Sequence, residues 1–445
     1  AVQQVQPVDE HSYGNIDEVQ LHHLDLELTV NFDAKALEGF VDLTFKRLKD
    51  DVLELVLDTR DITIDKTQQW VNDSWQDTPF DLADKDPDLG SKLSIQINDS
   101  TQKVRVYYKT QPQASGLQWL TPEQTAGKKH PFVYSQAQAI HARSFIPLQD
   151  SPAVRVTYNA NLKTPKELLA LMSAFNEPDT ELDGDYHFEM PQAIPPYLIA
   201  LGVGNLEFKA MSDRTGVYAE PSLLDPAVAE FDDTERMVQV TEEMYGPYRW
   251  GRYDLLILPP SFPYGGMENP RLSFITPTVI AGDKSLVNLI AHELAHSWSG
   301  NLVTNATWED FWLNEGFTSY VENRIMEELF GEKRATMERA LSVQGLHDEV
   351  EALPKEFTIL NVDLNGRDPD DAFSGVPYTK GQMFLTYLEK KFGREVFDAF
   401  LVEYFNAHAF QSLTTKEFKK YLKANLLDKH PGVVSMDEIE TWIHE

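Results

Sequence analysis

The sequence predicts an α+β protein, with a β-rich domain over residues 1–208 and a mainly helical domain over residues 209–445. Before residue 208, apolar and polar residues alternate in short runs, which is the two-residue period of half-buried strands. After residue 283, apolar residues recur at spacings of three and four, which is the period of helices. A length of 445 residues also exceeds what one ordinary core serves, so more than one domain is expected.

Five runs in the first domain have the alternation of strands. Turn-forming residues such as Asp33 and the pair Asp50-Asp51 separate them, which favours hairpins, so we expect an antiparallel β-domain. The runs cover residues 24–32, 41–45, 53–57, 93–97 and 104–106.

The second domain is expected to open with a helix from about Asp225 to Tyr245 and a strand from Tyr253 to Leu258. The Pro/Gly-rich passage 259–269 that follows cannot be helical. We expect the next helix to begin at Asp283, as its N-cap, and to end at Gly300. Further helices are predicted over residues 307–329, 334–350, 379–392, 395–407 and 415–427, the last with a capping box made by Thr414 and Glu417.

The chain is strongly acidic, with 71 Asp and Glu against 39 Lys and Arg and a net charge of −32 at pH 7. Such a charge disfavours nucleic acid and anionic membranes as partners, and fits either a generally solvated surface or an acidic docking face. The sequence contains no uninterrupted run of 18 or more apolar residues, so no segment is predicted to span a membrane. The chain opens with Ala1 and has no basic-then-apolar leader, so the sequence favours neither a cytoplasmic nor a periplasmic or secreted location. No pattern in it indicates an oligomeric state.

The chain has no cysteine, which excludes disulfides, thiol catalysis and cysteine-ligated metals. Any metal must therefore be bound by His, Asp or Glu. His292-Glu293-Leu294-Ala295-His296 places two histidines four residues apart, on one face of a predicted helix. Both imidazoles can then reach one zinc ion.

A catalytic zinc site uses three protein ligands and a water molecule. Glu315 follows His296 by 19 residues, and a helix, a turn and a second helix would bring it alongside. A surface helix with two solvated histidines is the alternative. The apolar residues around both motifs favour the metal, because buried histidines and carboxylates need partners. These residues are Leu289, Ile290, Leu294, Trp298, Trp308, Trp312 and Phe317.

Glu293 lies beside the predicted ligands, but points about 100° away from His292 around the helix. It is therefore expected to act as the general base, taking a proton from the attacking water and passing it to the leaving amine. These residues predict a metal hydrolase that binds one Zn²⁺ per chain.

A second motif, Gly265-Gly266-Met267-Glu268-Asn269, precedes the predicted zinc helix by about 25 residues. Together the two motifs resemble those of the gluzincin aminopeptidases, whose signature is GxMEN, then HExxH, then a glutamate 19 residues on. Residues 262–330 are similar to the leukotriene hydrolase and aminopeptidase B branch of that family. The resemblance implies a thermolysin-like catalytic domain that removes the N-terminal residue from peptides.

The resemblance also implies roles for single residues. Glu268 would bind the free α-amino group of the substrate, and Tyr378 would stabilise the oxyanion. Gln138, or else Gln136, would lie near the same amine, and Asp370 would lie on the pocket floor unless it is a solvated loop carboxylate. The motif residues Tyr264, Gly265, Gly266 and Met267 would line the substrate site.

The chain departs from the branch in two places. Phe373 occupies the position of a tyrosine in the leukotriene-processing enzymes that the chain resembles, which argues against an epoxide hydrolase side activity. The chain also ends at Glu445, where the branch continues into a helical third domain. Two other functions remain open: a thermolysin-like endopeptidase, which does not need Glu268, and a binding protein with an inactive site, which would be expected to lack Glu293 or a metal ligand.

Overall fold

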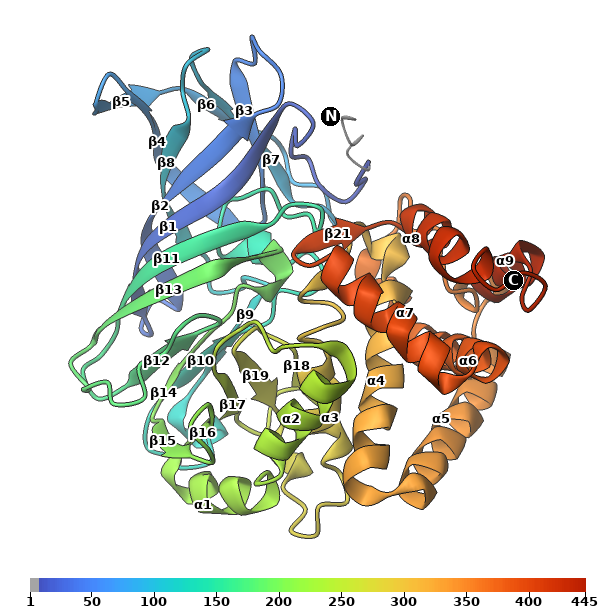
Figure 1. Ribbon diagram of the computed structural model, residues 1–445. Coiled ribbons are helices and arrows are strands. Elements are labelled where there is room, and N and C mark those ends of the chain that lie inside the picture. The colour runs from blue at the N-terminus through green and yellow to red at the C-terminus, as the bar shows by residue number, and fades with distance from the viewer. Residues whose placement is uncertain (1–7) are drawn as a thin grey trace. The chain divides into compact units, whose positions relative to one another are not determined.

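A computed structural model describes residues 8–445 of the protein, and its residues group into two compact units. The first unit comprises residues 8–229 and 252–280, and the second comprises residues 230–251 and 281–445. A β-rich part and a helical part follow one another along the chain (Figure 1). The α+β class is therefore confirmed, and the domain boundary near residue 208 stays a prediction.

The largest sheet of the first unit has seven strands whose inner faces carry the alternating apolar residues. All five predicted runs coincide with strands to within one residue. Three of them lie in β1, β2 and β8 of this sheet, and two lie in β3 and β7 of a three-stranded sheet. The antiparallel pairing that was predicted holds for the strand pairs of this sheet except β1 with β11, which is parallel. In spatial order the seven strands are β13 (Asp185–Ile194), β11 (Val156–Lys163), β1 (Val19–Asn31), β2 (Ala36–Arg47), β8 (Lys103–Thr110), β4 (Ile62–Val71) and β5 (Ser74–Thr78).

Three smaller sheets complete the first unit, together with α1 (Pro221–Glu230). The first is β3 (Glu54–Thr59), β7 (Ser91–Gln96) and β6 (Phe80–Leu82). The second is β12 (Leu169–Met172), β14 (Leu201–Gly204), β10 (Phe132–Ser135) and β9 (Leu117–Leu120). The third is β15 (Glu207–Ala210), β16 (Thr215–Ala219), β17 (Tyr253–Ile257), β19 (Leu272–Ile275) and β18 (Gly266–Met267).

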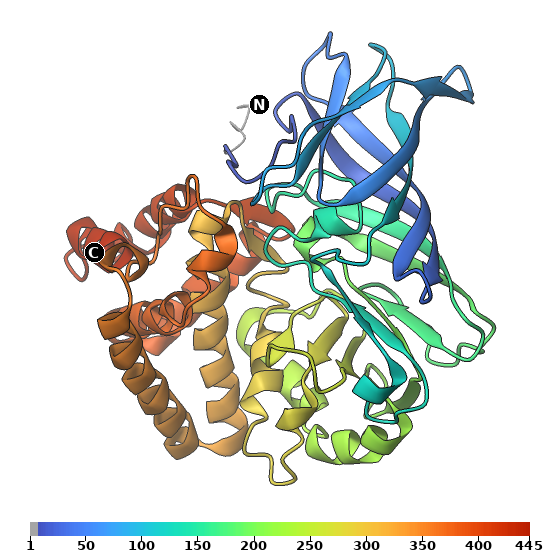
Figure 2. The same cartoon turned by 180° about the vertical axis from the view of Figure 1, so that it is seen from behind.

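The second unit is mainly helical, with one short parallel strand pair, β20 (Val303–Asn305) and β21 (Gln411–Leu413). Helices α4, α5 and α6 lie side by side in both views (Figure 1 and Figure 2). The helices are α2 (Thr234–Tyr245), α3 (Asn288–Ala295), α4 (Trp312–Phe330), α5 (Glu332–Ala352), α6 (Val376–Phe392), α7 (Arg394–Ala407), α8 (Thr415–Leu422) and α9 (Met436–His444).

Helix α4 is the centre of this unit, because it contacts α2, α3, α5 and α6 and is buried on most of its circumference. Its contact with α6 is exceptionally close. A Cβ atom added to Gly316 of α4 would lie 2.9 Å from the Cα atom of Gly381 of α6, and one added to Gly381 would lie 2.5 Å from the Cα atom of Gly316. Only glycine at both positions allows this approach.

Several predicted helix boundaries are wrong. Helix α4 begins at Trp312 rather than at residue 307, and α8 ends at Leu422 rather than at residue 427. The helix expected from Asp225 to Tyr245 is interrupted after α1 by a turn, in which the backbone N–H and hydroxyl of Thr234 both donate to the carbonyl of Phe231. Asp283 does not cap α3, because its carboxylate accepts from the N–H of Ser285 in a local turn. The helix ends at Ala295 rather than at Gly300. Helix α9 was not predicted.

Candidate metal and catalytic site

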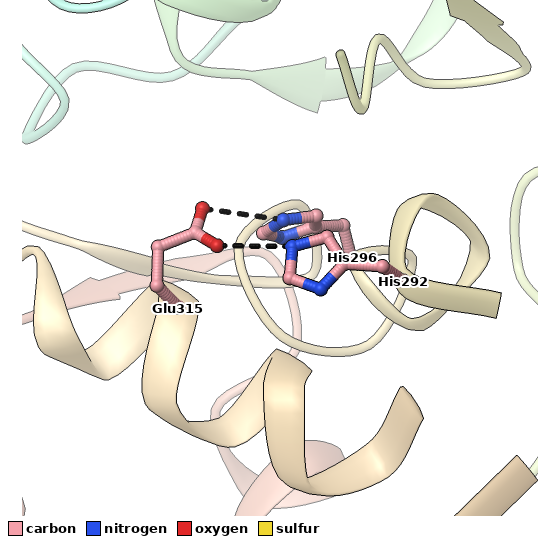
Figure 3. Close-up of side chains that lie close together, drawn as sticks. All are labelled: His292, His296 and Glu315. Atoms are coloured by element: carbon pink, nitrogen blue, oxygen red, sulfur yellow. Dashed lines mark hydrogen bonds and ion pairs between the residues drawn. The ribbon is translucent and has the colours of Figure 1, made fainter. Parts of the chain in front are cut away.

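Helices α3 and α4 bring the three predicted metal ligands together (Figure 3). His292 lies in the last turn of α3, His296 directly follows its end, and Glu315 lies in the first turn of α4. All three side chains are buried. The two imidazole rings are 4.9 Å apart at an angle of 81°, and both face the carboxylate of Glu315.

The two oxygens of Glu315 each face one histidine. Oε2 lies 3.1 Å from Nε2 of His292, and Oε1 lies 3.2 Å from Nε2 of His296. A tetrahedral ion with bonds of about 2.0–2.1 Å holds neighbouring ligand atoms roughly 3.3 Å apart. The side-chain positions therefore fit a zinc ion bound by the two Nε2 atoms and the carboxylate of Glu315.

Polar groups behind the histidines fix which ring nitrogen is free to bind a metal. Nδ1 of His292 lies 2.7 Å from Oε1 of Glu322, and Nδ1 of His296 lies 2.9 Å from the carbonyl oxygen of Ser299. Both partners are acceptors, so each Nδ1 carries the hydrogen and each Nε2 presents its lone pair to the metal position. Both the tautomers of the two histidines and the distances between the ligand atoms therefore fit a zinc ion.

The loop after α3 is shaped around His296. Gly300 adopts φ +110°, and a Cβ atom there would lie 2.7 Å from Nδ1 of His296. The hydroxyl of Thr318, on α4, lies 3.1 Å from the same Nδ1 and donates to the carbonyl of Ser299 at 2.9 Å. The sequence analysis missed Ser299 and Thr318. Their only signal was a hydroxyl residue three positions after each of the ligands His296 and Glu315.

The charges within the cluster support one another. Burial opposes ionisation of Glu315, but His296 and His292 outweigh it and lower the pKa of Glu315 to about 2. Burial also opposes the charge on His292, and the carboxylates of Glu315 and Glu322 outweigh it and raise the pKa of His292 well above its ordinary value. Binding of a metal cation would displace the proton that these carboxylates favour on His292.

Glu293 and Tyr378 lie beside the predicted ligands. Glu293 is 4% exposed, and one of its carboxylate oxygens lies within 4.8 Å of a ring nitrogen of His296. Tyr378, in the first turn of α6, stacks on His292 with ring centroids 5.8 Å apart and an angle of 23°. A buried carboxylate and a phenol thus lie on the same group of histidines.

An aromatic cluster lies next to Tyr378. The ring of Phe311 is 6.1 Å from that of Tyr378 and 5.2 Å from that of Phe373. Phe373 therefore brings a ring without a hydroxyl to this cluster. Asp370 precedes it in a short 3-10 turn, where its backbone N–H donates to the carboxylate of Asp368 at 3.0 Å.

The other predicted substrate residues belong to the first unit. Glu268 is 4% exposed and directly follows β18, which pairs with β19 through Gly266 and Met267. Gly265 precedes that strand, and its carbonyl accepts from the N–H of Thr276 at 2.8 Å. The short strand thus fixes the backbone on both sides of the motif.

Aromatic contacts connect β10 with the segment before this motif. Tyr134 contacts Phe262 at 5.6 Å, and Phe262 contacts Tyr264 at 5.9 Å. Tyr264 itself is 48% exposed. Gln136 and Gln138 follow β10 and are half-buried. The segment that carries both glutamines therefore follows directly from a strand packed against the loop that leads to Glu268.

The sequence also matches known protein families. A family model described as "Peptidase family M1 domain" matches residues 229–442, and one described as "Peptidase M1 N-terminal domain" matches residues 20–198. A leukotriene A-4 hydrolase of Xenopus laevis is 44% identical over 98% of this chain and 73% of its own length. The chain belongs to peptidase family M1. A leucine aminopeptidase 2 of Yarrowia lipolytica is 42% identical to this M1 peptidase over 88% of the chain and 61% of its own length.

The fold agrees with that assignment. The structure of yeast LTA4 hydrolase in complex with bestatin superposes on the whole of this M1 peptidase and on 71% of the yeast chain, with a TM-score of 0.93 at 36% identity. The prediction of a zinc-dependent aminopeptidase of this family is therefore confirmed. Among the helices of residues 8–445, none combines the length and the apolar character needed to cross a bilayer.

Proposed function

We propose that this M1 peptidase releases single N-terminal residues from peptides, with Glu293, Tyr378 and Glu268 in the roles that follow. The observation that carries the proposal is the buried cluster of His292, His296 and Glu315, in which the two carboxylate oxygens lie 3.1 and 3.2 Å from the two Nε2 atoms. A zinc ion bound there would polarise the scissile carbonyl and make a nearby water more acidic.

Glu293 is proposed to move the proton. Its carboxylate is buried beside His296, where a carboxylate oxygen can accept a proton from the attacking water. The same oxygen can then deliver the proton to the departing amine, so that one residue serves as base and as acid. Its burial keeps bulk water from competing for that proton.

Tyr378 is proposed to stabilise the negative oxygen that forms when the carbonyl is attacked. Its ring is held against His292 and against the edge of Phe311, so the position of its hydroxyl is restricted. A hydrogen bond that is aimed at the developing charge lowers the barrier more than it strengthens substrate binding.

Glu268 is proposed to bind the α-ammonium group of the substrate. It occupies the glutamate position of the GxMEN motif and is buried directly after β18. A buried carboxylate favours a cationic amine at a fixed distance, so cleavage is counted from the N-terminus. Gln136, Gln138, Tyr264 and Asp370 are proposed as further contacts on the support of the family motif alone.

The exopeptidase and the endopeptidase are separated by a pair of substrates that differ only at the N-terminus. The zinc-loaded protein should trim a free peptide one residue at a time and leave its N-acetylated twin almost intact. Loss of one partner from such a charge-assisted pair costs roughly 2–5 kcal/mol, or about 30- to several-thousand-fold in kcat/KM. Mass spectrometry of the two digests gives the cleavage sites directly.

Glu268→Ala should lose most activity on the free peptide. The ratio of kcat/KM for the free peptide to kcat/KM for the acetylated peptide should therefore become smaller. Glu207→Ala, which removes an exposed carboxylate of β15, serves as the matched control and should behave like the wild type. Internal cuts in the acetylated peptide, at rates similar to N-terminal trimming, would contradict the aminopeptidase proposal and favour the endopeptidase. The absence of a hydroxyl at Phe373 gives an epoxide hydrolase side activity no support.

A further inference from the structure

A groove of about 650 Å³ lies within the helical unit, between α5, α6 and the last turn of α9. Its volume is in the range of small-molecule sites. None of its lining residues belongs to the metal and catalytic cluster. The lining residues are Thr336, Arg339, Ala340, Val343, Gln344, His347, Gln382, Met383, Thr386, Tyr387, Lys390 and Trp442.

The two long walls of the groove run antiparallel. Helix α5 follows α4 after one residue, Gly331, and its last turn meets the start of α6, where the carboxylate of Glu349 accepts from the N–H of Gly375 at 2.7 Å. The beginning of α5 therefore lies beside the end of α6. Arg339 and Lys390, one from each wall, consequently share one half of the groove.

The middle of the groove is apolar. Val343 and Ala340 of α5 and Met383 of α6 contribute apolar side chains to its lining. The ring of Trp442 closes one side, 5.5 Å from the ring of Tyr387 and 5.7 Å from that of Phe384. Helix α9 thus provides an aromatic side wall, which suits a hydrocarbon chain.

The charge of the groove is opposite to that of the chain. The lining contains Arg339 and Lys390 and no Asp or Glu, in a protein with a net charge of −32. Arg339 donates to two neutral oxygens, of Asn323 at 2.8 Å and of Thr336 at 3.4 Å. Lys390 has no ion pair or hydrogen bond to another of residues 8–445. The positive charges at this end are therefore not neutralised by a lining carboxylate.

We propose that this groove binds a free aliphatic carboxylate, with its hydrocarbon chain between α5 and α6 and its carboxylate at Arg339 and Lys390. Two cationic donors beside an apolar channel match a single anionic head on an apolar tail. A cationic amphiphile would instead bring a like charge next to Arg339 and Lys390, and a neutral one would gain no charge-assisted contact with either. The proposal does not rest on the peptidase mechanism.

The probe is decanoate, because α5 rises about 12 Å between Arg339 and His347 and a ten-carbon chain has a similar reach. Isothermal titration of the zinc-loaded protein should show one saturable site per chain. Acetate has the same head without the chain, and decyltrimethylammonium has the same chain with a cationic head. Neither should bind at concentrations up to about 1 mM, where even weak sites are detected.

The double variant Arg339→Gln/Lys390→Gln should weaken decanoate binding at least about tenfold, because it removes both charge-assisted contacts. The matched control is Lys333→Gln/Lys355→Gln, which removes the same net charge at exposed positions outside the groove and should bind as the wild type does. Peptide hydrolysis should be unchanged in both. No saturable binding of decanoate, equal binding of the cationic amphiphile, or equal losses in the two double variants would each overturn the proposal.

Discussion

The hydroxyl of Ser299 donates a hydrogen bond to the backbone carbonyl of Asn314 at 3.0 Å. The carbonyl of Ser299 accepts from Nδ1 of His296 at 2.9 Å. One buried residue therefore connects a histidine of the metal cluster with the residue that directly precedes Glu315. This connection fixes His296 relative to the first turn of α4, which carries Glu315.

Replacing Ser299 by alanine removes this connection while leaving every ligand in place. Zinc affinity should fall by about 10- to 100-fold, the range found when an outer partner of a metal ligand is lost. Competition with a fluorescent chelator, starting from metal-free protein, measures the affinity. Ser299→Thr keeps the hydroxyl and should restore it. An unchanged zinc affinity in the alanine variant would mean that Ser299 serves the fold alone.

Glu315→Ala removes a proposed ligand itself. The remaining two-histidine site should bind zinc far more weakly, because catalytic sites need three protein ligands. Glu322→Gln keeps an acceptor for Nδ1 of His292, so its zinc affinity should fall much less. Equilibrium dialysis followed by metal analysis compares the two. Full zinc occupancy in Glu315→Ala would exclude it as the third ligand.

Glu293→Gln should separate metal binding from catalysis. Zinc content should stay close to that of the wild type, because the amide replaces a group outside the proposed ligand set. The value of kcat should fall by at least about 10²–10⁴-fold, the range for loss of a general base. Turnover at the wild-type rate, in protein with a measured full zinc content, would remove Glu293 from the mechanism.

Tyr378→Phe keeps the ring stacked on His292 and removes one hydroxyl. The value of kcat should fall by roughly 10²–10³-fold with little change in KM, because the hydroxyl acts in the transition state. Tyr387→Phe, on the same helix, removes a hydroxyl that bonds to Glu438 and is the matched control. A change confined to KM would make Tyr378 a contact of the bound substrate.

Asp254 predicts how stability depends on pH. Burial outweighs its pairing with Arg252 and raises the pKa of Asp254 from 3.8 to about 6. The folded state therefore binds more protons than the unfolded chain between these values. This contribution to the free energy of unfolding is present in full below about pH 4 and is lost as the pH rises through about 6, and it amounts to about 3 kcal/mol.

Urea titrations of the wild type and of Asp254→Asn between pH 4 and 7 test this expectation. The asparagine variant should lose that part of the pH dependence, so its stability relative to the wild type should rise with pH. Asp84→Asn, at an exposed loop position, should follow the wild type throughout. Parallel curves for the wild type and Asp254→Asn would contradict the raised pKa.

The sequence predicted correctly those features that depend on the periodicity or spacing of residues close together in the chain. The alternation that defines β1 and the spacing of His292, His296 and Glu315 both survive in the structure, because each depends on residues within one or two elements. The parallel pairing of β1 with β11 involves residues more than 130 positions apart, and no local pattern encodes it. Alternation alone does not distinguish parallel from antiparallel neighbours.

The start of α3 was predicted wrongly for a different reason. Asp283 has the composition of an N-cap, but the N–H groups of Gly282 and Lys284 are bound by the carboxylate of Glu230. That contact holds the loop in a turn and delays the helix until Asn288. A carboxylate more than 50 positions earlier thus decides where α3 begins, and propensity yields to tertiary contacts.

The close contact between Gly316 of α4 and Gly381 of α6 affects both the proposed metal ligand Glu315 and the proposed oxyanion-stabilising residue Tyr378. Gly316 directly follows Glu315, and Gly381 lies one helical turn after Tyr378. A methyl group at either position would push the helices apart and carry the phenol away from the histidines, although no reacting group had changed. Because glycine is already the smallest residue, no second substitution can restore the fit. Chimaeras that take α6 from another enzyme should therefore keep a functional site only if the donor also has glycine at this position.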